Sequence, residues 1–93
     1  MDIEQLRNEL DATDAQLIAL FTRRMELCAQ IGQLKALNGI AVYDAQREHT
    51  KLCTARALAA PGLEEYTAEL TECLMQLSKQ YQTDINEGRK NNG

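Results

Sequence analysis

The sequence predicts an all-α protein of three helices, in which the first helix is very long. Apolar residues recur at helical spacing along the first third of the chain. Turn-forming residues are scarce, with one proline and five glycines among 93 residues. Aromatic residues make up only 4% of the chain, and together these shortages disfavour a β-sandwich or barrel, which needs many turns.

The first helix is predicted from residue 2 to about residue 37. Its stripe follows alternating steps of three and four residues: Ile3, Leu6, Leu10, Thr13, Leu17, Leu20, Arg24, Leu27, Ile31 and Leu34. Asp2 and Gln5 can cap its start, and Asn38 or Gly39 can adopt the left-handed conformation at its end. Such a helix is roughly 50 Å long, whereas a compact domain of this size is about 30 Å across. We therefore expect a two-fold homodimer that covers the overhanging stripe.

Two further helices are expected after the first. The second covers about residues 44–58, with Asp44 as a candidate N-cap, and the segment APG at 60–62 ends it. The third begins near residue 63 and runs into the mid-80s. Its apolar row consists of Tyr66, Leu70, Cys73 or Leu74, Leu77 and Tyr81. We expect residues 89–93 to form a polar, disordered tail.

Composition and charge exclude several classes of function. The net charge is −4 and no basic run is present, which disfavours a nucleic-acid partner. No signal peptide or membrane span is recognisable. Cys28, Cys53 and Cys73 show neither metal-ligand spacing nor a disulfide framework, so we expect buried free thiols and no metal. These features predict a cytoplasmic protein without a membrane partner.

A guanidinium interrupts the apolar stripe at Arg24. Lys35 lies three turns further on, about 16 Å along the axis, and points the same way. An unpaired charge on such a stripe costs several kcal/mol, so Arg24 requires an anionic partner. That partner is either a buried Asp or Glu of the protein, which a single helix favours, or a bound anion.

Charges on the second helix suggest the wider site. Its polar row of Asp44, Arg47, Glu48 and Lys51 is typical of a solvated face with i,i+4 charge pairs. Arg47 can instead join Arg24 and Lys35 in a cationic pocket. Such a pocket fits a small polyanion, especially a dicarboxylate, because guanidinium groups pair with carboxylates in bidentate fashion.

Arg7 lies about 25 Å from Arg24 along the same helix, too far for both to hold one small molecule. In an antiparallel dimer it would serve the partner's site. His49 is the only histidine, and no serine–histidine or cysteine–histidine spacing suggests a nucleophile. Any chemistry at this site would therefore depend on positioning and electrostatics.

Four segments resemble the all-α chorismate mutase family: LRNELDATDAQLIALFTRR, IGQLK, NGIAVYDAQRE and SKQYQ. The resemblance extends over about residues 3–82, which places one chorismate mutase-like domain at residues 1–88. Ala41 departs from the family, which often has proline there. The resemblance implies a three-helix protomer, an intertwined homodimer and a monofunctional enzyme without a cofactor. Its reaction would be the Claisen rearrangement of chorismate to prephenate, which belongs to phenylalanine and tyrosine biosynthesis.

The resemblance also implies which residues bind the substrate carboxylates. Arg24 and the partner's Arg7 would hold these two groups. Arg47 would support the same cationic end, and Ser78 would assist by hydrogen bonding a carboxylate.

The remaining implied roles concern the reacting ether and the ring hydroxyl. Lys35 and Gln82 would donate to the ether oxygen, where negative charge builds as the C–O bond breaks. Glu48 would accept a hydrogen bond from the substrate hydroxyl, and Asp44 would line that end of the site.

Two other interpretations remain open from the sequence. One is an isochorismate-pyruvate lyase, which would use the same fold and a similar pocket for a related elimination. The other is a non-catalytic helical dimerisation module, in which the charged residues form structural ion pairs.

Overall fold

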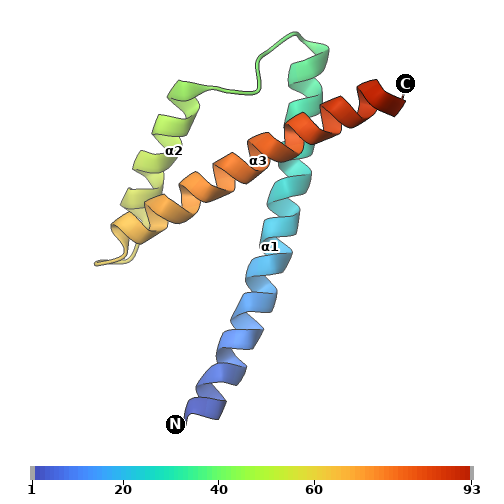
Figure 1. The fold of residues 1–93 in the computed structure, drawn as a ribbon. Helices are drawn as coiled ribbons and strands as arrows, with labels where there is room; N and C mark the ends of the chain where they lie inside the picture. Colours follow the sequence, from blue (N-terminus) through green and yellow to red (C-terminus); the bar gives the residue numbers. More distant parts are fainter. Residues whose placement is uncertain (1, 93) are drawn as a thin grey trace.

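The computed structural model describes the backbone of residues 2–92 and the side chains of residues 2–88. Three helices make up the chain: α1 (Ile3–Leu37), α2 (Ala45–Leu58) and α3 (Glu64–Asn92) (Figure 1). No strand occurs between residues 2 and 92. The prediction of an all-α fold with a very long first helix is confirmed.

Local hydrogen bonds explain where α1 begins and ends. The side chain of Asp2 accepts from the backbone N–H of Gln5 at 2.8 Å. The side chain of Gln5 accepts in return from the backbone N–H of Asp2 at 3.0 Å, which completes a capping box. At the other end Asn38 is the C-cap and Gly39 has a φ of +66°, a value that glycine adopts without strain. Both predicted ends are therefore confirmed.

The ends of α2 also follow from identifiable residues. Asp44 is the N-cap, and its Oδ1 accepts from the backbone N–H of Arg47 at 3.0 Å. Helix α2 ends at Leu58, and the following turn contains Gly62 with a φ of +89°.

Helix α3 continues to Asn92, beyond the predicted end in the mid-80s. Gly88 does not interrupt it, since a lone glycine weakens a helix without ending it. The side chains of residues 89–92 and the whole of Gly93 lie outside the described residues, so the disordered tail stays a prediction.

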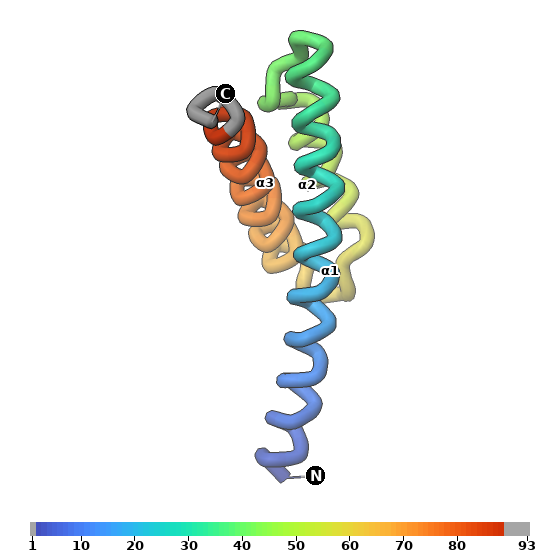
Figure 2. The backbone as a smooth tube through the Cα atoms, turned by 90° about the vertical axis from the view of Figure 1, so that its right-hand side faces the viewer, coloured from blue at the N-terminus to red at the C-terminus, as the bar shows by residue number. Residues whose placement is uncertain are grey.

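Helix α3 packs against both other helices, whereas α1 and α2 do not pack against each other. The chain measures 55 × 30 × 14 Å, with a radius of gyration of 16.7 Å, against about 12 Å for a compact domain of this length. Figure 2 shows the N-terminal part of α1 extending well beyond α2 and α3. The predicted overhang is therefore present in the protomer.

The protomer has little core of its own. Its buried apolar residues are Ala55, Ala68 and Met75, and none of the large side chains between residues 2 and 88 is fully buried. Along the overhang, Leu10 and Leu17 are 57% and 55% exposed. The apolar stripe of α1 thus lacks a partner within its own chain over its first half.

The face that α3 buries differs from its predicted apolar row. Ala68, Met75, Ser78 and Gln82 are buried. Of the predicted row, Tyr66, Leu70, Leu77 and Tyr81 are exposed and Leu74 is half-buried. The buried face of α3 thus includes two polar residues, Ser78 and Gln82, whose side chains hydrogen bond to α1.

The cysteines also differ from expectation. The prediction of buried thiols is wrong for Cys53 and Cys73, which are exposed in the protomer, while Cys28 is half-buried. All three thiols are free. None of the three helices, over the part described, combines the length and the apolar character needed to cross a membrane.

Candidate active site

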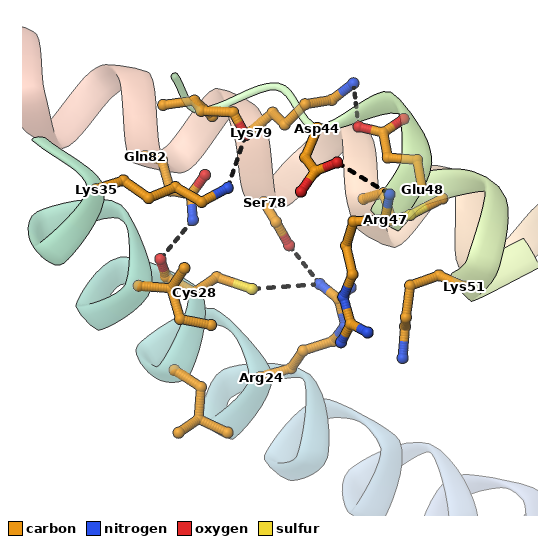
Figure 3. A pocket seen from close by; sticks show the side chains of 14 residues that line it. Arg24, Cys28, Lys35, Asp44, Arg47, Glu48, Lys51, Ser78, Lys79 and Gln82 are labelled. Carbon is orange, nitrogen blue, oxygen red and sulfur yellow. Dashed lines mark hydrogen bonds and ion pairs between the residues drawn. The ribbon is translucent and has the colours of Figure 1, made fainter. Parts of the chain in front are cut away.

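A cavity of about 480 Å³ lies between the C-terminal half of α1, the start of α2 and the middle of α3 (Figure 3). All of the site residues predicted from the sequence line it except Arg7: Arg24, Lys35, Asp44, Arg47, Glu48, Ser78 and Gln82. Lys51 and Lys79 also line it, together with apolar side chains such as Ile31 and Met75. Residues from three separate segments therefore face one space.

Arg24 enters this cavity from α1 and is half-buried. Its Nη1 donates to the backbone carbonyl of Leu74 at 3.3 Å and to the buried hydroxyl of Ser78. The same nitrogen lies 3.7 Å from Sγ of Cys28. All these partners are neutral, and no carboxylate among residues 2–88 pairs with this guanidinium. The structural salt bridge that a single helix favours is therefore absent between residues 2 and 88 of this chain.

Lys35 and Gln82 lie together toward the other end of the cavity (Figure 3). Lys35 Nζ donates to the carbonyl of Val42 at 3.1 Å, and Gln82 Nε2 donates to the carbonyl of Cys28 at 2.6 Å. An ammonium has three N–H donors and a primary amide has two. Both groups therefore retain donors for a ligand.

Gly32 allows Gln82 to reach this position. It is the buried residue of α1, and an added Cβ would lie 2.8 Å from Cγ of Gln82. A contact this short does not occur between unstrained carbon atoms. Glycine at this position therefore lets α3 approach α1 closely enough to place the amide of Gln82 beside the cavity.

The two carboxylates of the cavity already have partners. Asp44 caps α2, which removes part of the like-charge conflict with Glu48 one turn later. Glu48 Oε2 pairs with Lys79 Nζ at 2.8 Å. Arg47 and Lys51 form no ion pair with any residue between 2 and 88. The cationic groups thus exceed the acidic ones in this space, which suits a small anion with two negative charges.

Sequence reasoning missed two lysines of the cavity. The polar row of α2 predicts Lys51 on a solvated face, but its position one turn after Arg47 places both on the same side of α2, facing the cavity. Lys79 carried no such signal, because the position beside Ser78 does not fix the direction of a long side chain.

Arg7 is the exception among the predicted site residues. Its side chain is 68% exposed and pairs with Glu4 of the same helix at 3.3 Å. It does not line the cavity of its own chain. This agrees with its distance from Arg24 along the helix, which is too long for both side chains to reach one small ligand. A role for Arg7 at this site depends on a second copy of the chain.

The sequence profile of the family described as chorismate mutase type II matches residues 6–83. That match covers nearly the whole described chain and includes every residue that lines the cavity. The chain belongs to the chorismate mutase type II family. The family resemblance noted in the sequence is therefore confirmed.

Two curated relatives of this family member carry the name T-protein. That of Haemophilus influenzae is 41% identical over 58 residues, which are 62% of this chain and 15% of the relative. That of Enterobacter agglomerans is 33% identical over 55 residues, 59% of this chain and again 15% of the relative. The aligned part is thus a small fraction of either relative. No solved structure matches the chain significantly.

Proposed function

We propose that this chorismate mutase family member converts chorismate to prephenate in the cytoplasm, as a step of phenylalanine and tyrosine biosynthesis. The observation that carries the proposal is the distribution of donors in the cavity. Arg24 and Arg47 have no carboxylate partner among residues 2–88, and Lys35 and Gln82 place further donors toward the other end. A compact dianion with a reacting oxygen between its charged groups matches this arrangement.

The reaction requires the enzyme to hold one conformer of one substrate. In the rearrangement a C–C bond forms as the ether C–O bond breaks, with no proton transfer and no external nucleophile. Arg24, with Ser78 behind it, and Arg47 bind carboxylate oxygens and restrain the flexible enolpyruvyl side chain over the ring. Such restraint lowers the barrier because the loss of rotational freedom occurs on binding.

Lys35 and Gln82 act on the charge that develops during bond breaking. The ether oxygen becomes more negative in the transition state than in the substrate, so donors placed beside it bind the transition state more tightly. A single preorganised donor of this kind contributes about 3 kcal/mol, which corresponds to roughly a hundredfold in rate. Lys35 suits this role because its ammonium is already charged and need not transfer a proton.

The acidic residues act at the ring hydroxyl. Glu48 accepts a hydrogen bond from this group through a carboxylate oxygen, and Asp44 lines the same end of the cavity while capping α2. These contacts orient the ring relative to the side chain held by Arg24 and Arg47.

The proposed assembly is an intertwined homodimer in which each site receives Arg7 from the other chain. The exposed stripe of α1 and the absence of a fully buried large side chain among residues 2–88 support this assembly. An apolar hollow lined by Leu17, Phe21, Leu70 and Leu74 also reaches Arg24. A second α1 packed there would bring its N-terminal region toward the cavity and supply the partner's Arg7 to the second substrate carboxylate.

A direct assay tests the proposed reaction. Purified protein is incubated with chorismate, the loss of its ultraviolet absorbance is followed and the product is identified. Lys35→Ala serves as the blank and isochorismate as the parallel substrate. We expect prephenate from the native protein and a rate at least about a hundredfold lower from Lys35→Ala.

Three other results would contradict the proposal. Near-normal turnover by Lys35→Ala would remove this lysine from the mechanism. Salicylate and pyruvate from isochorismate, with chorismate unchanged, would assign a lyase. A folded dimer that converts neither substrate, and whose melting temperature does not rise with a dicarboxylate ligand, would indicate a dimerisation module.

A further inference from the structure

Lys79 makes contacts that the proposed mechanism does not use. It lines the cavity from α3, one residue after Ser78. We infer that Lys79 is a positioning residue: held by Tyr43, it fixes the carboxylate of Glu48 in the orientation that accepts the substrate hydroxyl. This inference rests on the proposed function and adds a residue to it.

The contacts of Lys79 join three segments of the chain. Its Nζ lies 2.8 Å from Oε2 of Glu48 on α2, and the side chains of both residues are 24% exposed. The same Nζ lies 4.8 Å from the ring centroid of Tyr43, which belongs to the connection between α1 and α2. An ammonium between a carboxylate and an aromatic face is attracted by both. Lys79 is therefore restrained from two directions.

The restraint passes from Lys79 to Glu48. A glutamate side chain has several rotatable bonds, and an unpaired one at the rim of a cavity would sample many orientations. The ion pair occupies Oε2, while Oε1 accepts no hydrogen bond from the residues between 2 and 88. One oxygen is thus held by the protein and the other is left for a hydroxyl donor, so that Glu48 is oriented before the substrate arrives.

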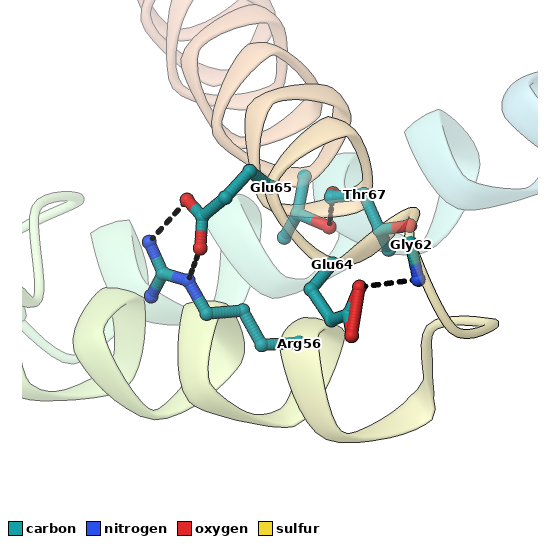
Figure 4. A network of polar contacts seen from close by, with 6 residues as sticks. Arg56, Gly62, Glu64, Glu65 and Thr67 are labelled. Carbon is teal, nitrogen blue, oxygen red and sulfur yellow. Dashed lines mark hydrogen bonds and ion pairs between the residues drawn. The ribbon is translucent and has the colours of Figure 1, made fainter.

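A second ion pair between α2 and α3 provides the natural comparison (Figure 4). Arg56 Nε lies 3.0 Å from Oε1 of Glu65, but these side chains are 45% and 79% exposed and neither lines the cavity. The hydrogen bond to Glu65 raises the pKa of Arg56 above its already high ordinary value. Both pairs join the same two helices, so the Arg56 pair controls for the loss of an ion pair between α2 and α3.

The test compares Lys79→Met, Lys79→Arg and the control Arg56→Met in the full chain, with kcat and KM measured for chorismate. We expect Lys79→Met to lower kcat about tenfold with KM changed less than about threefold. Lys79→Arg keeps the charge and should recover most of this loss. Arg56→Met should stay within about twofold of the native protein in both constants. Tyr43→Leu keeps the lysine without its aromatic contact and should lower kcat by a smaller factor, about threefold.

A double variant separates positioning from direct contact. Because Lys79 acts through Glu48, adding Lys79→Met to Glu48→Gln should lower kcat by less than about twofold further. An unchanged kcat in Lys79→Met, or full additivity with Glu48→Gln, would overturn the inference. A rise in KM alone would overturn it too, since it would show that Lys79 binds the substrate itself. If Lys79→Met does not fold, Lys79→Arg and Tyr43→Leu provide the test. The inference predicts a smaller loss of kcat in Lys79→Arg, which keeps the charge, so an equal loss of kcat in both variants would reject it. Failure of the native protein to convert chorismate would instead overturn the proposed function.

Discussion

The two halves of α1 share one sequence pattern but have different surroundings. Residues 3–20 are all exposed in the protomer, although apolar side chains recur there every three or four residues. Residues 21–37 continue the same pattern, yet they pack against α3 and carry Arg24, Gly32 and Lys35. The comparison shows that periodicity identifies a helix face that needs covering. It does not identify what covers the face. In the second half α3 packs on the neighbouring positions Met25, Cys28 and Gly32. Leu27, Ile31 and Leu34 of the stripe are still 42%, 50% and 60% exposed there. In our proposal a second chain covers the stripe.

The largest expected effect comes from removing the guanidinium that each half contributes to the proposed site. Arg7→Ala and Arg24→Ala should each lower kcat/KM by about a thousandfold, because each leaves a substrate carboxylate without its guanidinium. When the two variants are mixed and refolded, random pairing gives heterodimers with one intact site, and about a quarter of native activity should return. Arg23→Ala, next to Arg24 but 63% exposed and outside the cavity, is the control.

That complementation experiment has a clear negative outcome. Heterodimers that are present by mass but show no recovered activity would mean that the first half of α1 contributes nothing to the site. The two halves would then differ in packing alone.

A smaller effect should follow from a charge on the exposed stripe of the first half. Leu10→Glu places a carboxylate where the second α1 would pack, so we expect dissociation and a loss of activity of about a hundredfold. The control Ala12→Glu lies about 200° around the same helix and should keep both assembly and activity. Sedimentation at the assay concentration measures whether each variant is a dimer. If Leu10→Glu remains a dimer, this stripe is not the interface.

The contact between the second half of α1 and α3 can be weakened from the α3 side. Gln82→Leu keeps the volume near Gly32 but removes the amide donor. It should lower kcat by about a hundredfold with little change in KM, because the charge on the ether oxygen develops only in the transition state. A change in KM alone would show that Gln82 binds the ground state and would remove it from the catalytic donors.

The smallest expected effect comes from the α1 side of the same contact. Gly32→Ala introduces a Cβ that would lie 2.8 Å from Cγ of Gln82, a contact too short to persist, so the Gln82 side chain must shift. We expect kcat to fall about threefold to tenfold and stability to fall by about 1–2 kcal/mol. Combining it with Gln82→Ala should restore part of the stability, as measured by urea denaturation, because the contacts with Cγ and Cδ are removed and only the Cβ contact at 3.2 Å remains. If the double variant is no more stable than Gly32→Ala, the strain does not arise from the contact with Gln82.

Most of the fold was predictable because its signals are local. The capping box of Asp2 and Gln5, the cap at Asp44 and the glycine at residue 39 each act within a few residues. The all-α class and the length of α1 followed from the same kind of signal. The end of α3 was less predictable, since no proline or capping residue marks it in the sequence.

The site was predictable only in part, because side-chain direction depends on tertiary contacts. The charged residues of α1 and α2 were recognisable from their spacing and from the family resemblance. The buried face of α3 was not, because residue type there suggested the exposed row that begins at Tyr66. The need for glycine at residue 32 appears only when Gln82 is placed opposite it, and the direction of Lys79 appears only when Glu48 and Tyr43 are placed around it.

The small core of the protomer has a thermodynamic consequence. If no large side chain is fully buried until two chains meet, folding and association form a single bimolecular equilibrium. Each tenfold dilution then removes about 1.4 kcal/mol of stability. A rate assay at nanomolar concentration and a thermal melt at micromolar concentration would sample molecules whose stability differs by about 4 kcal/mol. The melting temperature of this protein should therefore rise with its concentration, and destabilised variants should lose activity first in the most dilute samples.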